Sequence, residues 1–519
     1  MSRLHSPLWF PRLTALAAAL SLAYTNDIIA LDRQGMGHGG GYVREMSVPA
    51  EPARSKIHAR PASVNTPANI FVSNCDDSGS GSLRDAASIA VSGDTIDLTG
   101  LTCAAISLTT GEIVLAVDDV TLIGPGQGDP VIGPAAGMTG RVLKHTGHGL
   151  LAISGLHLSG GYYGIAPATP YLKGGCLYSA GSVTFDNSKA VGCTVYDPSL
   201  NPVQTANGGA ISAYGDLHLN NSTVSNNKVK SIGAVRGGGV YARGNLYIQG
   251  SFVYDNYIKS NTFVVGGGAT ARGDVVVQNS GFEYNYAGQL SVGAVDHSFG
   301  GGLFAERNAT ITSSLFYRNG AHNVGGISFT GGSDFTAAIV NSTISTNTAT
   351  NLLGGVYSQT PLTVSNSTIA FNRSGYTGSV YVAGAGLGVY QTTVDLQSSI
   401  IAQNYTPGNG LDFSAYGSTI TGSGNLIMRS IVSPPGTLTD DPLLTPLGNY
   451  GGATDVHALA AASPAIDRGN NNAGLAYDQR GAPFPRLYGA GVDIGAYELQ
   501  SPPDLDRIFR NGFDGTLGR

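Results

Sequence analysis

Carboxylates would do the most recognisable chemistry in this chain, and they are sparse in its middle. Hydrolysis of a glycosidic bond needs two carboxyl groups facing one groove. Elimination from a uronic acid needs a strong base beside a calcium-binding carboxylate cluster. The acids of the central region do not fall into stacked columns: Asp216, Asp255, Asp274, Glu283, Asp296, Glu306 and Asp334. The sequence therefore favours a protein without enzymatic activity, and it indicates no catalytic residue, metal ligand set or cofactor.

Two short motifs suggest chemistry that their surroundings do not support. The Gly-His-Gly run at 147–149 resembles a histidine motif of polygalacturonases, but the acidic motifs of those enzymes are missing. The Arg-Gly-Asp run at 272–274 spells a cell-adhesion tripeptide, yet Arg-Gly-Asn stands at the equivalent place, 243–245, one repeat earlier. We interpret the first run as the beginning of a strand and the second as an ordinary turn.

Aromatic and basic residues gather after the middle repeats, where the connecting segments are longest. Tyr257 and Tyr286 occupy equivalent positions, so we expect them to stack on the outside of the molecule. Segments 228–237, 257–266 and 286–300 are expected to form a wall of loops beside shorter central coils. Aromatic rings beside polar loops suit sugar binding, although stacked tyrosines also occur as purely structural features. The candidate glycan groove consists of Tyr257, Lys259, Tyr286, Asp296 and His297.

A second set of polar residues lies near the C-terminus. Its members are His457, Asp467, Arg480, Asp493 and Glu498. We expect them to form a buried network of salt bridges and hydrogen bonds that fixes an irregular cap. A functional site is the alternative interpretation.

These residues are embedded in an internal repeat that dominates the sequence. A pair of small residues followed by an apolar strand recurs eight times, and the residue after each pair stands at 176, 210, 240, 269, 303, 327, 356 and 387. An asparagine follows the third strand in seven successive units, and Cys193 takes that place in the first. The seven are Asn227, Asn256, Asn285, Asn319, Asn347, Asn372 and Asn404.

The repeat predicts an all-β fold, a right-handed parallel β-helix solenoid. Each unit holds three short strands between Gly, Asn and Ser turns, and it buries its apolar face only by stacking on the next unit. Crossovers between parallel strands favour right-handed winding. A helical repeat of this length is disfavoured by the alternating apolar residues and by the Gly and Asn content. The asparagines are expected to adopt the left-handed conformation and to form a hydrogen-bonded ladder between coils.

The sequence divides into five segments. Residues 1–23 are expected to be a signal peptide, because basic residues precede an apolar run too short to span a bilayer. Residues 24–66 form a polar lead, and 67–430 the β-helix, with clear repeats over 174–405. Residues 431–499 form an irregular C-terminal cap, and 500–519 a flexible tail that is a candidate sorting signal. Apolar spacing over 82–91 predicts a short helix capping the N-terminal end.

Composition limits the partners of the chain. Charged residues make up 12%, the formal net charge is -6, and Lys and Arg do not cluster as in a nucleic-acid footprint. No later stretch is apolar enough for a transmembrane helix. The four cysteines favour two local disulfides, Cys75 with Cys103 and Cys176 with Cys193, over a metal site. Three connectivities remain open for four cysteines. We expect a monomer.

Two segments resemble known families. Residues 75–86 (Cys-Asp-Asp-Ser-Gly-Ser-Gly-Ser-Leu-Arg-Asp-Ala), followed by Gly-Asp-Thr-Ile at 93–96, resemble the beginning of secreted bacterial β-helix proteins of the pectin-lyase-like type. The C-terminal part resembles the choice-of-anchor Q domain in Asn-Tyr-Gly-Gly (449–452), His-Ala-Leu (457–459), Ser-Pro-Ala-Ile-Asp (463–467), Asp-Gln-Arg-Gly (478–481) and Asp-Ile-Gly-Ala-Tyr-Glu (493–498). The resemblances imply a β-helix and export, often with surface attachment, and they imply little about activity.

Taken together, the sequence predicts an exported, surface-associated bacterial protein that acts in adhesion or in matrix or glycan interaction. Its expected partners are polysaccharides or cell-surface components, not nucleic acid, and no cofactor is expected. The alternative is a polysaccharide lyase or glycoside hydrolase with its site in the wall over residues 228–300.

Overall fold

The computed structural model describes residues 67–126, 128, 130–164, 171–196, 205–290, 297–377, 384–407 and 410–500. The expected signal peptide, the polar lead and the tail beyond residue 500 lie outside these residues. Within the described part, the chain is almost entirely β-structure, with one α-helix and one short 3-10 helix, η1 (Gly332–Asp334). No helix in this part is long and apolar enough to cross a membrane.

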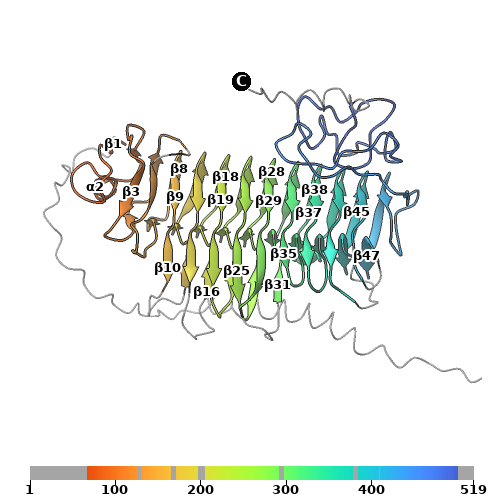
Figure 1. Ribbon diagram of the computed structural model, residues 1–519, viewed down its shortest axis with the longest axis horizontal. Coiled ribbons are helices and arrows are strands. Elements are labelled where there is room, and N and C mark those ends of the chain that lie inside the picture. Colours follow the sequence, from red (N-terminus) through yellow and green to blue (C-terminus); the bar gives the residue numbers. More distant parts are fainter. Residues whose placement is uncertain are drawn as a thin grey trace, which may run out of the picture. The chain divides into compact units, whose positions relative to one another are not determined.

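The strands form five parallel sheets, which we label A to E, and each strand pairs with the equivalent strand of the next coil. A complete coil runs from sheet C through A, B and D to E and then returns to C. The expected right-handed parallel β-helix is confirmed, and Figure 1 shows its coils stacked along the long axis.

Sheets A, B and C form the body of the solenoid and contain the three strands per unit that the sequence indicates. Sheet A consists of β1 (Asn69–Phe71), β2 (Asp94–Asp97), β5 (Val120–Ile123), β8 (Leu150–Ser154), β13 (Ser182–Asp186), β18 (Leu217–Asn220), β23 (Leu246–Gln249), β28 (Val275–Gln278), β33 (Ala309–Thr312), β37 (Ala337–Val340), β41 (Leu362–Ser365), β45 (Thr393–Gln397) and β48 (Thr419–Ser423). Sheet B consists of β3 (Ala105–Leu108), β6 (Val131–Pro134), β9 (His157–Ser159), β14 (Lys189–Val191), β19 (Thr223–Ser225), β24 (Phe252–Tyr254), β29 (Gly281–Glu283), β34 (Leu315–Tyr317), β38 (Thr343–Ser345), β42 (Thr368–Ala370), β46 (Ile400–Ala402) and β49 (Leu426–Ile427). Sheet C consists of β4 (Ile113–Leu115), β7 (Leu143–His145), β12 (Leu177–Ser179), β17 (Ile211–Ala213), β22 (Val240–Ala242), β27 (Ala269–Ala271), β32 (Leu303–Ala305), β36 (Ile327–Phe329), β40 (Val356–Ser358), β44 (Leu387–Tyr390) and β47 (Phe413–Tyr416).

One continuous apolar core fills the body. Alternate residues of each strand point inward, so that Leu217 and Leu219 of β18 are buried while His218 between them is not. Equivalent side chains stack along the axis, and the rings of Phe282 and Phe316 lie parallel with centroids 4.7 Å apart. Each coil therefore buries its apolar face against its neighbours, as a solenoid requires.

Sheets D and E form a ridge on the body, which we call the fin. Sheet D consists of β10 (Tyr162–Gly164), β15 (Thr194–Tyr196), β20 (Lys228–Lys230), β25 (Tyr257–Ser260), β30 (Tyr286–Gln289), β35 (Gly320–Ala321), β39 (Thr348–Ala349) and β43 (Arg373–Ser374). Sheet E consists of β11 (Tyr171–Lys173), β16 (Thr205–Asn207), β21 (Val235–Arg236), β26 (Phe263–Val265) and β31 (His297–Phe299). In Figure 1 the fin strands β10, β16, β25 and β31 lie in the lower row.

The fin corrects the expectation of a wall of loops. The described residues of segments 228–237, 257–266 and 286–300 contain strands of sheets D and E. Most of these strands contribute an apolar residue to a small separate core, to which Val229, Val235, Ile258 and Val264 belong. Two short sheets become stable here because they bury these residues against each other and extend from coil to coil.

The expected N-terminal helix is confirmed. Helix α2 (Leu83–Ile89) begins after Ser82, whose Oγ accepts a hydrogen bond from the Asp85 backbone N–H at 3.1 Å. A side-chain cap of this kind satisfies a backbone donor that the first helical turn leaves without a partner. Leu83 and Ala86 are buried and join the body core. The helix thus closes the N-terminal end of the core.

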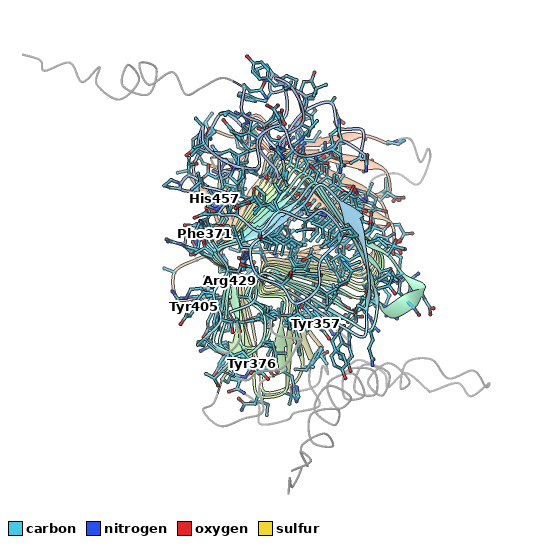
Figure 2. The ribbon with its side chains drawn as sticks, turned by 90° about the vertical axis from the view of Figure 1, so that its right-hand side faces the viewer. Tyr357, Phe371, Tyr376, Tyr405, Arg429 and His457 are labelled. Atoms are coloured by element: carbon cyan, nitrogen blue, oxygen red, sulfur yellow. A yellow bond between two sulfur atoms is a disulfide. The ribbon has the colours of Figure 1, made fainter. Side chains whose placement is uncertain are left out.

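The C-terminal segment 431–499 is an irregular lobe, and it packs along one flank of the solenoid. Apolar residues of the lobe share a core with Ile400 and Ala402 of sheet B. His457 Nε2 lies 2.9 Å from Ser345 Oγ, and its ring centroid lies 4.9 Å from that of Phe371. Figure 1 shows the lobe above β38 and β45, and Figure 2 shows His457 and Phe371 from the C-terminal end. The lobe therefore covers the outer face of sheet B over the last coils.

Candidate functional site

The fin joins the body through a narrow neck, where an asparagine turn leaves sheet B and a glycine turn returns to sheet C. Gly266 has φ +67°, which an L residue rarely adopts. A Cβ on Gly267 would lie 2.7 Å from the backbone of Tyr286, and a Cβ on Gly268 would lie 3.0 Å from Asn285 Cγ. The repeated glycines are therefore required because the two turns approach each other closely.

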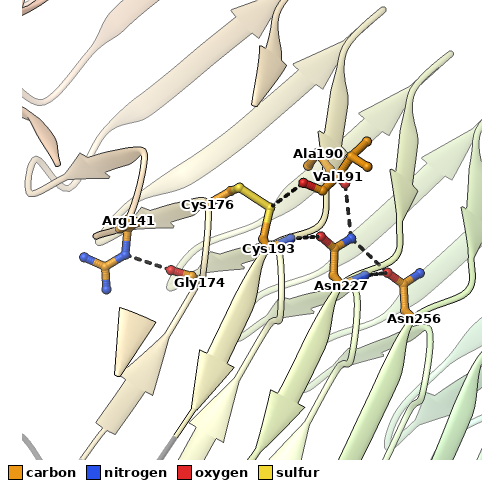
Figure 3. Close-up of a disulfide and its surroundings, with 8 residues drawn as sticks. All are labelled: Arg141, Gly174, Cys176, Ala190, Val191, Cys193, Asn227 and Asn256. Carbon is orange, nitrogen blue, oxygen red and sulfur yellow. Dashed lines mark hydrogen bonds between the residues drawn. A yellow bond between two sulfur atoms is a disulfide. The ribbon is translucent and has the colours of Figure 1, made fainter. Parts of the chain in front are cut away.

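A ladder of asparagine side chains runs through the neck from coil to coil. Each Nδ2 donates to the Oδ1 of the next asparagine at 2.9 Å, in six successive steps from Asn227 to Asn404. Each backbone N–H donates to the same oxygen. All seven side chains are buried. Figure 3 shows the first rungs, and every amide points in the same direction along the axis.

Each end of the ladder has its own partner. At one end Cys193, which is disulfide-bonded to Cys176, donates its backbone N–H to Asn227 Oδ1 at 2.8 Å. At the other end Asp412 Oδ1 accepts hydrogen bonds from the backbone N–H of Asn404 at 2.6 Å and from its Nδ2 at 3.0 Å. Burial raises the pKa of Asp412 to about 6, although the bonds from Asn404 oppose that shift. The pairing of Cys75 with Cys103 is also present, so both preferred disulfides are confirmed.

A second buried ladder, made of serines, was missed in the sequence. The backbone N–H of each serine donates to the Oγ of the next, and the series ends on Asn425 Oδ1. Its sequence signal is a serine five residues before each ladder asparagine, as in Ser222 and Asn227. The left-handed conformation also differs from expectation. It belongs to the preceding residue, such as Asn226 with φ 57°, because the ladder asparagine already begins the straight segment that enters sheet D.

The outer face of sheet D, called the D face below, carries the aromatic and basic residues. Because middle residues such as Val229 and Ile258 enter the fin core, the residues on either side of them point outward. None of these outward residues is acidic. They are Tyr162, Gly164, Thr194, Tyr196, Lys228, Lys230, Tyr257, Lys259, Tyr286, Gly288, Gly320, Thr348 and Arg373.

Three of the five residues predicted for a glycan groove meet on this face. The rings of Tyr257 and Tyr286 stack with centroids 5.6 Å apart and an interplanar angle of 16°. Lys259 Nζ lies 5.0 Å from the Tyr257 centroid and 6.0 Å from that of Tyr286. The ammonium group is thus held beside two aromatic rings, in the range of a cation–π interaction.

Of the other two residues, His297 does not join this cluster. His297 lies in β31 of sheet E, in register with Phe263, and Val264 beside Phe263 enters the fin core. His297 therefore points away from that core on the opposite side of the fin from the tyrosines. Asp296 lies outside the described residues. The four described residues do not form one groove, because Tyr257, Lys259 and Tyr286 lie on sheet D and His297 lies on sheet E.

A loose group of carboxylates lies at the outer face of sheet B. Glu283 on the outer face of sheet B has its pKa raised by burial and then by the nearby charges of Asp455 and Asp255. Asp455 belongs to the C-terminal lobe, so these acids meet only where the lobe borders sheet B. The described residues contain no group of three or more His, Cys, Asp or Glu side chains arranged to hold a metal ion.

The two short motifs lie in turns that lead from a strand of sheet C to the next strand of sheet A. The Arg272 guanidinium lies 3.8 Å from the Glu306 carboxylate, and Asp274 Oδ1 accepts a hydrogen bond from Asn308 Nδ2 at 3.1 Å. His148 donates its backbone N–H to Asp118 Oδ1 at 3.0 Å. Both motifs therefore make contacts within the solenoid.

Four of the five polar residues predicted for the C-terminal lobe are buried, namely His457, Arg480, Asp493 and Glu498, whereas Asp467 is exposed. The Arg480 guanidinium donates to Asp478 Oδ2 at 2.6 Å and lies 3.8 Å from the Phe484 ring centroid. Glu498 accepts hydrogen bonds from two backbone N–H groups, and burial raises the pKa of this carboxyl to about 8. Asp467 likewise accepts from the backbone at residues 490 and 491. The set connects segments of a lobe that has little regular structure.

Comparison with known proteins gives little beyond the fold. No family model matches the sequence, and no curated protein matches it. Among solved structures, the chain is similar to the crystal structure of pectate lyase Pel9A, with 14% sequence identity and a TM-score of 0.39. That alignment covers 84% of this chain and 97% of the other. We therefore base the function on the geometry of this chain.

Proposed function

We propose that the protein is exported, associates with the cell surface, and binds an extended glycan on the D face. The observation that supports this most strongly is the pair Lys230 and Lys259. They stand directly opposite each other on neighbouring strands, next to the stacked Tyr257 and Tyr286, and none of the outward strand residues described for this face is acidic. Like charges opposite each other destabilise a sheet by roughly 0.2–1 kcal/mol. The stability of the fold does not explain this arrangement, whereas a bound ligand would interact with both ammonium groups.

The chemistry of the cluster suits a sugar. An aromatic ring offers a flat apolar surface to the C–H face of a pyranose, and an ammonium group donates up to three hydrogen bonds to hydroxyl or carboxylate oxygens. The strands hold these groups at the spacing of neighbouring coils, about 4.8 Å. Because the backbone of each coil is fixed by the next, little ordering is needed on binding.

Export is supported by the two disulfides, which persist in oxidising compartments. Surface attachment is a separate part of the proposal: the C-terminal part resembles an anchor domain, and the tail beyond it, residues 500–519, is the candidate sorting signal. Fractionation of cells that express the full chain, or a chain ending at residue 500, tests it. Equal release of both into the medium would contradict attachment through the tail.

The glycan proposal is tested by a glycan array with the purified protein, followed by titration of the best ligand. The variant Tyr257→Ala/Tyr286→Ala should lose binding. A matched control is available on the outer face of sheet A, where the rings of His218 and Tyr247 stack with centroids 4.4 Å apart. The variant His218→Ala/Tyr247→Ala removes a comparable pair and should bind as the parent does.

An assay for new reducing ends and for unsaturated products distinguishes binding from catalysis. The proposal expects neither product. Turnover that survives in the tyrosine variant would support the lyase or hydrolase alternative and would contradict a role limited to binding. Equal loss of binding in both aromatic variants would place the site elsewhere.

A further inference from the structure

We infer that the ligand of the D face is a polyanionic polysaccharide and that the face holds it at two stations, the second made by Arg373 and Tyr405. The first station is the cluster of Tyr257, Tyr286 and Lys259. This inference rests on the proposed function and adds to it the chemical class and the length of the ligand.

The second station repeats the chemistry of the first. The Arg373 guanidinium lies 5.1 Å from the ring centroid of Tyr405. Arg373 is exposed, and 52% of Tyr405 is exposed. The Tyr405 backbone donates to Asn372 O at 2.8 Å and accepts from Ser374 N–H at 2.8 Å, which fixes it as a continuation of sheet D. Figure 2 shows Tyr405 at the margin of the end view, below Phe371.

The two stations lie in one row. Strand pairing places Tyr257, Tyr286, Gly320, Thr348, Arg373 and Tyr405 in register on successive coils. Tyr286 and Tyr405 are separated by four coil steps of about 4.8 Å, roughly 19 Å in all. The residues between the stations, Gly320 and Thr348, are small. A Cβ on Gly320 would lie 3.2 Å from Tyr286 Cδ2, so the glycine makes room for that ring. The row therefore has an aromatic ring and a cationic group at each end, and only small residues between them.

The positive charge of the D face indicates the chemical class of its ligand. The chain has a formal net charge of -6, yet the described residues of the D face include Lys228, Lys230, Lys259 and Arg373 and no acid. Neutral sugars form no ion pairs with the four cations, whereas repeated carboxylates or sulfates relieve the repulsion between them. Since a chain that reaches both stations binds the second one intramolecularly, its affinity exceeds that of a short oligomer.

The test is a calorimetric titration with size-graded oligomers of three kinds: galacturonate oligomers, sulfated heparin-derived oligomers, and neutral xylan oligomers. We expect binding of one or both acidic series, with an affinity increase of about tenfold or more once an oligomer spans the two stations. The two acidic series distinguish carboxylate from sulfate as the recognised anion.

The variant Arg373→Ala/Tyr405→Ala should abolish this increase with length and leave the affinity for the shortest binding oligomer within about twofold. A matched control is Arg307→Ala/Phe335→Ala, which removes a cation–π pair away from the D face; the exposed Arg307 guanidinium lies 4.8 Å from the ring centroid of the half-buried Phe335. The control should retain the full length dependence. Thermal unfolding followed by circular dichroism verifies that each variant is folded.

The outcomes separate the inference from the proposed function. Equal binding of neutral and acidic series, or an affinity that is insensitive to length, would overturn the inference while leaving glycan binding in place. A length dependence that persists in Arg373→Ala/Tyr405→Ala would overturn the second station alone. Absence of binding to any glycan, in this titration and on the array, would contradict the proposed function itself.

Discussion

The ladder asparagines and the outward residues of the D face are adjacent in the sequence. The residue type is constant at the first position and varies from coil to coil at the second. Asn256 is followed by Tyr257, Asn319 by Gly320, and Asn372 by Arg373. The first position of each pair is asparagine in all seven coils, whereas the second is Lys, Tyr, Tyr, Gly, Thr, Arg and Tyr. The backbone register is the same for both positions, so the difference does not come from the geometry of the coil.

Burial explains the constant position. Each ladder amide is out of contact with water, so its donors and acceptor must be satisfied by the coils on both sides. Any other side chain would leave a buried polar group without a partner, which costs about 1–3 kcal/mol. The exposed position carries no such requirement. Its concentration of rings and cations is therefore better explained by contact with something outside the chain.

The largest expected effect is on the ladder side of this comparison. Asn347→Ala removes hydrogen bonds with Asn319, Asn372 and the Phe316 carbonyl. We expect a loss of about 3–4 kcal/mol in the free energy of unfolding, at roughly 1 kcal/mol for each of four bonds. Denaturant unfolding measures it. The exposed Asn472→Ala should change stability by about 0.5 kcal/mol or less. Equal losses in the two variants would contradict the ladder.

The second effect concerns the first rung of the ladder. The variant Cys176→Ser/Cys193→Ser opens a loop with a sequence separation of 17 residues. A disulfide of this size contributes about 3 kcal/mol. We also expect faster hydrogen exchange at the backbone amide of residue 193, because the disulfide no longer holds the turn that donates to Asn227. The variant Cys75→Ser/Cys103→Ser should lose comparable stability without altering exchange at residue 193.

The third effect is a pH dependence at the far end of the ladder. The pKa of Asp412 is raised from 3.8 to about 6 in the folded protein. The native state therefore retains its proton more readily than the unfolded state, and the contribution of this group to stability falls as pH rises from about 4 to 6. Asp412→Asn keeps an acceptor oxygen without the charge. Its stability relative to the parent should increase by roughly 2–3 kcal/mol between pH 3.5 and 7. A difference that does not vary with pH would show that Asp412 ionises there as it does in water.

The smallest expected effect on stability belongs to the D face. Tyr257→Ala/Tyr286→Ala removes one stacked pair, which contributes about 0.5–1.5 kcal/mol beyond the area it buries. Both rings are partly solvent-exposed, with Tyr286 40% exposed, so we expect a loss of about 1 kcal/mol. Thermal unfolding checks this. A loss as large as that of Asn347→Ala would mean that the tyrosines serve mainly to hold the coils together.

The body of the fold could be predicted because its signals are long and regular. Strands such as Leu217–Asn220 alternate clearly, and the constant spacing of the asparagines reflects a position with one acceptable chemistry. The fin could not be recognised in the same way. Its strands are two to four residues long, and each contributes about one buried residue to the small core, as Val229 does. Such segments resemble loops until their neighbours are stacked on them.

For the same reason, the position of the candidate site could be predicted only in part from the sequence. Equivalent spacing placed Tyr257 beside Tyr286, and Lys259 came with them because it lies two residues along the same strand. His297 was grouped with them by proximity in sequence, but it belongs to the other sheet of the fin. The flank covered by the C-terminal lobe was also not foreseeable, since its contacts, such as that between Ser345 and His457, span more than a hundred residues.

The most direct test of the central claim measures stability and ligand affinity together in Asn347→Ala and Tyr257→Ala/Tyr286→Ala. The ligand is the acidic oligomer that binds the parent most tightly. We expect the asparagine variant to lose about 3–4 kcal/mol of stability and to keep its Kd within about twofold, because the ladder stabilises the fold and does not contact the ligand. The tyrosine variant should lose about 1 kcal/mol of stability and at least about tenfold in affinity. A tyrosine variant that binds like the parent would contradict the claim that the D face is the binding surface.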